Sequence, residues 1–147
     1  MIALIQRVSS SKVTVNNQKI STINKGYNIL LGIFKDDDFN DIDKLVSKIV
    51  KLRLFSDECG KLNYNILDIN GEVLVVSQFT LTANCKKGNR PSFSSAKNPQ
   101  DAKTLYKAFI KKLSQYLEVK EGIFGASMSV DIVNDGPVTI ILDSKNL

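Results

Sequence analysis

The chain has 147 residues, which is close to the size of one ordinary domain and enough to bury a core without disulfides or metals. With 43% hydrophobic and 24% charged residues, its composition is that of a globular protein rather than a disordered one. The net charge of +5 permits an anionic partner such as RNA, although ordinary surface charge explains it equally well. The complete absence of histidine excludes Ser-His-Asp and Cys-His catalysis and removes the most common metal ligand.

The cysteines and the first residues give no sign of secretion or of a membrane. Cys59 and Cys85 lack the spacing of a redox or zinc motif and are expected to be reduced intracellular thiols. The opening residues, MIALIQRVSS, indicate a strand, because their apolar stretch is too short for a signal peptide. No run approaches the roughly 20 apolar residues that a membrane helix needs. We therefore expect a cytoplasmic protein, with no metal and no cofactor.

The first third of the chain is predicted to be antiparallel β-structure. Residues 2–15 alternate well enough to indicate two short strands. Asn16–Gln18 is typical of a hairpin turn, which leads into a strand at residues 19–23. Residues 27–34, YNILLGIF, indicate a buried strand.

Two segments have the apolar spacing of amphipathic helices. In residues 36–52 the helix is expected to begin at Asp38 or Asn40, and its acidic run favours a helix N-terminus over a metal site. Asn98 and Pro99 are typical of the cap and first position of a second helix. The apolar face of this second helix comprises Ala102, Leu105, Tyr106, Phe109 and Leu113.

The remaining strands complete the predicted fold. Residues 72–81, EVLVVSQFTL, indicate a buried strand that becomes polar at Ser77. Residues 128–134 and 137–142 indicate two further strands near the end of the chain. Because repeats and linkers are absent, we expect one α+β domain over residues 1–147, with a curved, mostly antiparallel, barrel-like sheet packed with two helices.

The stretch SQFTL, residues 77–81, ends the buried strand with hydroxyl and amide side chains. It is either a strand edge whose polar groups are satisfied or the floor of a pocket that presents donors to a polar ligand. Thr80 is a poor candidate for a nucleophile, because a hydroxyl needs an adjacent base and no histidine is present to supply one.

The stretch KKGNRPSF, residues 86–93, places three cations and one aromatic residue around Gly88. Lys86, Lys87 and Arg90 suit contacts to phosphate groups, with stacking nearby. The same composition also suits a mobile, solvated loop, so both interpretations stay open.

The stretch NDGPVT, residues 134–139, contains a strong hairpin signal in Asp135–Gly136. Pro137 complicates a simple turn, because it lacks the N–H that the returning strand would use. X-Pro bonds are also where cis peptides occur. A cis Gly136–Pro137 bond, without a Cβ at the glycine, would form a rigid backbone wall for a small ligand.

These stretches together resemble the D-aminoacyl-tRNA deacylases, also called D-tyrosyl-tRNA deacylases. The resemblance runs from IQRV at residues 5–8 through SQFTL and GNRPSF to FGASMSVDIVNDGPVTIILD at residues 124–143. It covers essentially the whole chain, and the order and spacing of SQFTL and NDGPVT make it specific. It implies a homodimeric enzyme that hydrolyses the ester joining a D-amino acid, or glycine, to the 3′ end of tRNA.

The resemblance also implies roles for individual residues. Ser77, Gln78, Phe79 and Thr80 would line the pocket near the ester, where backbone N–H groups of Phe79 and Thr80 are candidate oxyanion donors. Phe124 and Met128 would pack the adenine of the terminal adenosine. Gly136 and Pro137, joined by a cis bond and braced by Arg7, would enter the partner's pocket and reject L side chains. Catalysis would be assisted by the 2′-hydroxyl of the tRNA itself. Thr82 stands where the family often has an aromatic residue, so a stacking role is not expected there.

Two other functions remain compatible with the residues. A non-catalytic RNA-binding module would use the same basic loop and pocket without turnover. A small-ester hydrolase would use Thr80 as its nucleophile, and it would act on esters that lack a 2′-hydroxyl.

Overall fold

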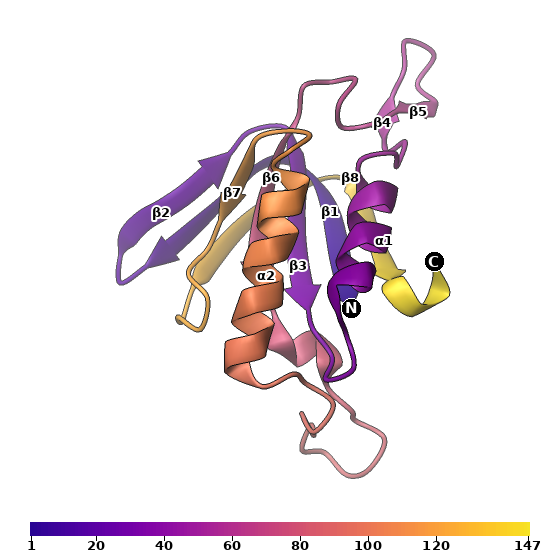
Figure 1. The fold of residues 1–147 in the computed structure, drawn as a ribbon. Helices are drawn as coiled ribbons and strands as arrows, with labels where there is room; N and C mark the ends of the chain where they lie inside the picture. The colour runs from indigo at the N-terminus through magenta and orange to yellow at the C-terminus, as the bar shows by residue number, and fades with distance from the viewer.

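The first and last strands of the chain lie side by side and organise a sheet that curves around one face of two helices. This arrangement is seen in a computed structural model that describes residues 1–147 (Figure 1). The strands are β1 (Ile2–Val15), β2 (Gln18–Ile23), β3 (Gly26–Gly32), β4 (Phe55–Ser56), β5 (Leu62–Tyr64), β6 (Glu72–Ser77), β7 (Val119–Glu121) and β8 (Ser129–Asp143). The helices are α1 (Phe39–Ile49) and α2 (Pro99–Leu113), with short 3-10 turns η1 (Phe79–Thr82) and η2 (Ser144–Asn146). The predicted α+β fold, with a barrel-like sheet and two α-helices, is confirmed. Neither α-helix has the length and apolar character that crossing a membrane would require.

The main sheet has the order β2-β1-β3-β6-β7, and β8 is added along the other edge of β1. All three neighbours of β1 are antiparallel to it, as the sequence predicted. The pairs β3–β6 and β6–β7 are parallel. Because β8 pairs with β1 alone, its second edge has no partner strand.

The strand count at each end of the chain corrects the prediction. Residues 2–15 form one strand instead of two, and residues 129–143 also form one strand instead of two. The register explains the error, because β8 accompanies β1 from the Ile2–Asp143 pair to the Thr14–Ser129 pair. Each long strand therefore continues through its polar residues because the other strand pairs with it along nearly its whole length.

The predicted hairpin at Asp135–Gly136 is wrong, because the chain does not reverse there. Thr139 pairs with Gln6 and Asn134 pairs with Val8, so a single β1 residue lies opposite four residues of β8. These four residues, 135–138, bulge out of the ladder and are called the excursion below. A bulge of this kind redirects the backbone without ending the strand.

The core lies between the sheet and the two helices, which pack side by side on the same face (Figure 1). Its largest fully buried side chains include Tyr27, Tyr106, Phe55 and Phe109. The apolar positions predicted for α2 are all buried there. The helical spacing therefore identified the correct inward face.

Side-chain caps fix the start of both helices at the predicted positions. Asp38 accepts from the amide of Asn40 and forms a capping box with Asp41, while Asn98 accepts from the amide of Asp101 just before Pro99. Burial alone would raise the pKa of Asp41. Hydrogen bonds from the Asp38 amide, the Ser144 hydroxyl and the Lys145 ammonium outweigh burial and lower that pKa to about 2.

Candidate functional site

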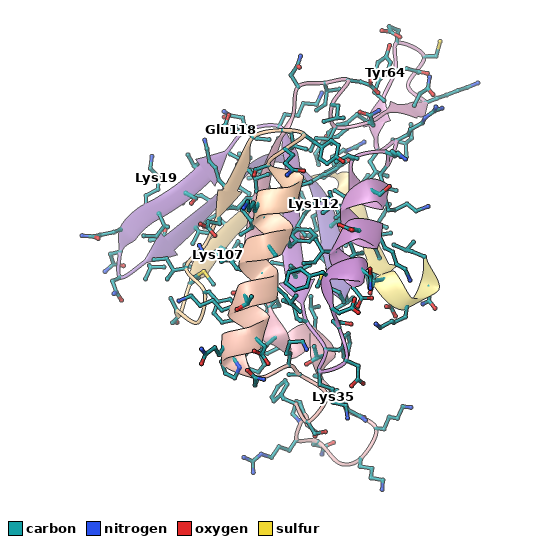
Figure 2. The ribbon with its side chains drawn as sticks, in the orientation of Figure 1. Lys19, Lys35, Tyr64, Lys107, Lys112 and Glu118 are labelled. Atoms are coloured by element: carbon teal, nitrogen blue, oxygen red, sulfur yellow. The ribbon has the colours of Figure 1, made fainter.

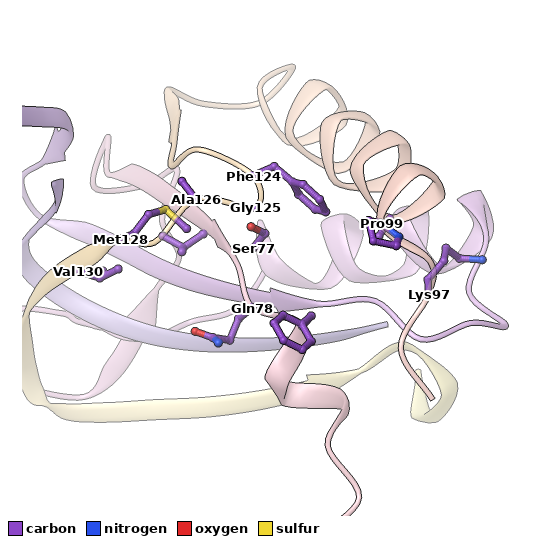
Figure 3. Close-up of a pocket in the computed structure, with 12 residues that line it drawn as sticks. Ser77, Gln78, Lys97, Pro99, Phe124, Gly125, Ala126, Met128 and Val130 are labelled. Carbon is purple, nitrogen blue, oxygen red and sulfur yellow. The ribbon is translucent and has the colours of Figure 1, made fainter. Parts of the chain in front are cut away.

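A cavity of about 420 Å³ lies where the end of β6, the start of α2 and the β7–β8 connection meet (Figure 3). Its lining residues come from three distant parts of the chain. The polar ones are Ser77, Gln78 and Lys97, and the large apolar ones are Phe79, Pro99, Phe124 and Met128. The fold thus brings Ser77, Gln78 and Phe79 together with Phe124 and Met128. Thr80, which the resemblance also implied for the lining, is not among the lining residues.

The SQFTL stretch forms one wall of this cavity because the chain leaves the sheet there. The amide of Gln78 donates to the Leu31 carbonyl at 2.8 Å, which ties the end of β6 to β3. The turn η1 then passes directly over Gly32, where an added Cβ would lie only 2.9 Å from the Cβ of Leu81. The stretch is therefore both the end of a strand, tied to β3 by a backbone hydrogen bond, and a pocket wall, which joins the two alternatives left open by the sequence.

Thr80 and Thr82 do not line the cavity. The Thr80 hydroxyl accepts a hydrogen bond from the side-chain amide (Nε2) of Gln78, and no basic side chain bonds to it. Thr82 is buried and its hydroxyl donates to the Phe79 carbonyl at 2.8 Å, so it closes η1 instead. Phe79 and Thr80 begin this turn, where backbone N–H groups have no carbonyl partner within the turn itself.

The opposite wall is held by contacts to the core. The ring of Phe124 lies 5.5 Å from the ring of Tyr106, whose hydroxyl donates to the Val75 carbonyl at 2.8 Å. Burial raises the pKa of Tyr106 far above its ordinary value, so this donor stays protonated at all ordinary pH values. Met128 fits because residue 122 is glycine, where an added Cβ would lie 2.7 Å from the methionine sulfur.

The chemistry of the lining is unusual for an active site. It includes a hydroxyl, an amide and one ammonium group but no carboxylate, thiol or phenol. The ammonium of Lys97 donates to the Lys35 carbonyl at 2.7 Å, and Figure 3 shows it at the end of the pocket beyond Pro99. The cavity can orient a polar substrate and stabilise negative charge, but none of its side chains is suited to act as a general base.

The excursion lies outside this cavity. Gly136 and Pro137 are exposed, and neither residue lines the cavity of its own chain. The peptide bond between them is cis, and Gly136 has a φ of +125°. At this φ an L side chain is strained, which is the physical reason for glycine here.

Arg7 supports the excursion through contacts with Asp135. Its guanidinium donates to the carbonyls of Leu54 at 2.6 Å and Asp135 at 3.2 Å, and it pairs with the Asp135 carboxylate at 3.3 Å. The resemblance implied a contact with the carbonyls of Gly136 and Pro137. The structure places the contact one residue earlier, at Asp135.

Asn134 and Thr139 close the base of the excursion, and the sequence reasoning missed both. The Asn134 side chain accepts from the amide of Val138 at 3.2 Å and donates to the Thr139 hydroxyl at 2.9 Å. Their position immediately before and after Asp135–Val138 is the signal that could have identified them.

Comparison with known proteins identifies the family. A family model described as D-Tyr-tRNA(Tyr) deacylase matches residues 4–143. The chain belongs to the D-Tyr-tRNA(Tyr) deacylase family. Relatives named D-aminoacyl-tRNA deacylase are 60% identical in a Nitratiruptor species and 55% identical in Aquifex aeolicus, and each alignment covers 100% of both chains.

Two solved structures have a fold similar to that of this chain. One, named "c-Myc DNA Unwinding Element Binding Protein", is 42% identical with a TM-score of 0.93 and covers 97% of this chain and 98% of the other. Another, described as a probable eukaryotic D-amino acid tRNA deacylase, is 15% identical with a TM-score of 0.83 and covers 96% of this chain and 97% of the other. The second likeness concerns the fold alone.

Proposed function

We propose that the protein hydrolyses the ester bond between a D-amino acid and the 3′ end of tRNA and releases the free amino acid and the tRNA. Family membership and the names of its full-length relatives support this ester hydrolase activity. The observation that carries the proposal is the cavity at the end of β6, which offers hydroxyl and amide groups but no base or activated nucleophile. A substrate that brings its own activating group fits such a site.

In the proposed mechanism the free 2′-hydroxyl of the terminal adenosine activates a water molecule. Water adds to the ester carbonyl, the bond from the carbonyl carbon to the ribose 3′-oxygen breaks, and that oxygen takes up a proton. The N–H groups of Phe79 and Thr80 stabilise the negative carbonyl oxygen as it forms. Phe124 and Met128 pack against the adenine, while Ser77 and Gln78 orient the ester.

The proposed filter for chirality comes from a second copy of the chain. Gly136 and Pro137 are exposed at the free edge of β8, so they can enter a pocket that is not their own. Val133 and Ile141, on either side of the excursion, are 55% and 61% exposed, as expected for residues that a two-fold dimer would bury. A backbone wall at the partner's pocket rejects an L side chain, admits a D side chain and also admits glycine.

A nucleic-acid-binding module without turnover is the second candidate. The observation in its favour is the name of the 42% identical structure, which refers to DNA binding. Such a module would bind charged tRNA and leave the ester intact. Since charged tRNA is the ligand in both cases, we propose a cytoplasmic location for either function.

Matched D- and L-tyrosyl-tRNA test the proposal directly. We expect the D ester to be hydrolysed and the L ester to persist. Equal rates on both would eliminate the chiral filter, and tight binding without hydrolysis would favour the binding module. A D-tyrosyl-tRNA that ends in 2′-deoxyadenosine tests the mechanism, because it should persist if the 2′-hydroxyl activates water but be cleaved if Thr80 is the nucleophile.

Mixed dimers test the contribution of the partner. One chain has Gly136→Ala and the other has Gln78→Ala, so one site of the heterodimer receives both changes and the other receives neither. We expect partial recovery of activity relative to either parent homodimer. A fully active monomer, or no recovery in isolated heterodimers, would reject the cross-subunit arrangement.

A further inference from the structure

The chain leaves the cavity at Phe79 and returns to it at Lys97, and the segment between them forms a projecting loop. This segment lies at the bottom of Figure 1, between η1 and the start of α2. We call residues 84–92 the basic loop. Asn84 and Ser92 close it by exchanging two backbone hydrogen bonds of 2.8 and 3.0 Å. An isolated antiparallel β-bridge between Phe34 and Ala96 holds the segment that runs from the loop back to α2, so the loop has a defined position beside the cavity.

The basic loop has uncompensated positive charge. The sequence contains no Asp or Glu between Glu72 and Asp101. Lys86, Lys87 and Arg90 are exposed, and no ion pair of the structure includes them. Near the Lys35 label in Figure 2, side chains of this region extend away from the body of the protein. Three free cations lie together, so a polyanion is the partner that this surface suits.

An exposed aromatic pair connects the basic loop to the cavity. Phe93 follows the loop and packs edge-on against Phe79, with ring centroids 4.9 Å apart and an interplanar angle of 63°. Phe79 lines the cavity and is 60% exposed, while Phe93 is 37% exposed. Exposed aromatic rings beside free cations are the usual components of surfaces that bind single-stranded nucleic acids, because bases stack on the rings while cations contact phosphates.

We propose that the basic loop binds the phosphates of the single-stranded nucleotides that precede the terminal adenosine of tRNA. The pair Phe79–Phe93 then provides the stacking surface for the base next to that adenosine. This inference rests on the proposed function, since it requires the terminal adenosine to occupy the adjacent cavity. It assigns to Lys86, Lys87 and Arg90 a contribution to RNA affinity and none to the chemical step.

A second basic surface provides a matched control. Lys44, Lys48, Lys51 and Arg53 line a separate hollow of about 450 Å³ at α1 and the segment after it. This hollow shares no lining residue with the cavity, and no aromatic residue lines it. The triple variant Lys44→Ala, Lys48→Ala, Lys51→Ala therefore removes the same charge as Lys86→Ala, Lys87→Ala, Arg90→Ala without touching the proposed RNA path.

The experiment compares both triple variants with the wild type on three D-tyrosyl esters: adenosine, the trinucleotide CCA and full tRNA. We expect the basic-loop variant to act normally on the adenosine ester, while its KM for the CCA and tRNA esters rises by roughly tenfold or more. For the tRNA ester, the slope of log KM against log salt concentration should fall by about two, the value for three lost phosphate contacts on a single strand. The α1 variant should match the wild type on the adenosine and CCA esters.

The outcomes separate this inference from the proposed function. A wild type that cleaves none of the esters refutes the proposed function. Binding of an uncharged, fluorescently labelled RNA ending in CCA then still tests the loop. Equal affinities of the wild type and the basic-loop variant for that RNA, or equal KM values on the CCA ester, would overturn the inference. A loss confined to the α1 variant would overturn it too and would place the RNA on α1.

Discussion

Replacing Gly136 by alanine is the most informative single substitution in this chain. The new Cβ would lie 2.9 Å from an Arg7 guanidinium nitrogen, 2.9 Å from a Val138 methyl group and 3.0 Å from the Val138 amide nitrogen. Arg7 cannot easily retreat, because its guanidinium is bound to the Leu54 and Asp135 carbonyls. The φ of +125° adds strain for any L residue, and such backbone conformations cost about 1–3 kcal/mol each.

We therefore expect Gly136→Ala to lower the free energy of unfolding by about 1–3 kcal/mol and to move the excursion. If the excursion forms the chiral filter, the ratio of D- to L-tyrosyl-tRNA hydrolysis should fall by at least about tenfold, which corresponds to roughly 1.4 kcal/mol of lost discrimination. Denaturant titration measures the stability and single-turnover deacylation measures the ratio.

The matched control is Gly60→Ala. Gly60 also has a positive φ, +76°, but nothing lies within 4 Å of an added Cβ and the residue is remote from the cavity lining. This variant should lose some stability while keeping the wild-type ratio. A folded Gly136→Ala protein that also keeps the wild-type D/L ratio would refute the assignment of the filter to this backbone.

Three further predictions concern the Thr80 hydroxyl, the lack of a metal requirement and the stability of the fold in acid. Thr80→Ala should slow hydrolysis by less than the roughly 100- to 1,000-fold cost of losing an oxyanion donor, because the Thr80 hydroxyl bonds to Gln78 and does not line the cavity. A trapped ester between the acyl group and Thr80 would contradict this prediction. Activity should survive exhaustive chelation, because the chain has no histidine and its cysteines are 26 positions apart; loss on chelation with recovery by zinc would contradict it. Asp41 has a pKa of about 2 in the folded state, below the ordinary value of 3.8, so its ionisation stabilises the fold above about pH 4 by about 2 kcal/mol. That stabilisation should decrease as the pH falls below about 4 and through 2, and it should be lost near pH 1. Asp41→Asn should therefore be less stable than the wild type at pH 7, and the difference should shrink steadily below about pH 4; equal stability at pH 7 would refute the assignment.

Local sequence signals were sufficient to predict where the two helices begin and where the SQFTL stretch ends a buried strand. The 3.6-residue spacing and the caps Asp38 and Asn98 depend only on neighbouring residues, and both helices begin where these signals indicate. Ser77 also marks the end of a buried strand because the polar residues follow an apolar run directly.

Long-range pairing explains what the sequence did not predict. Residues 2–15 were expected to form two strands, but they form one, and within it the buried Ser11 hydroxyl bonds to the side chain of Asn28 and the carbonyl of Asp131. The turn signal at Asp135–Gly136 failed for the same reason, since β1 supplies partners on both sides of it. The contribution of Lys97 and Pro99 to the cavity depends on where α2 packs, which no local pattern specifies.

The pairing of β1 with β8 also determines when the sheet can finish folding during translation. Ile2 pairs with Asp143 and Thr14 pairs with Ser129. The first strand to be synthesised, β1, therefore lacks its longest partner until nearly all 147 residues have been translated. Contacts of such high sequence separation form late, and until then the nascent sheet exposes an unpaired edge. The excursion, which depends on Arg7 for its support, can take its final shape only after residues 129–143 have left the ribosome and docked. A ribosome paused before this point would hold a chain whose cavity-forming strand β6 is already made but whose Gly136–Pro137 segment is still missing.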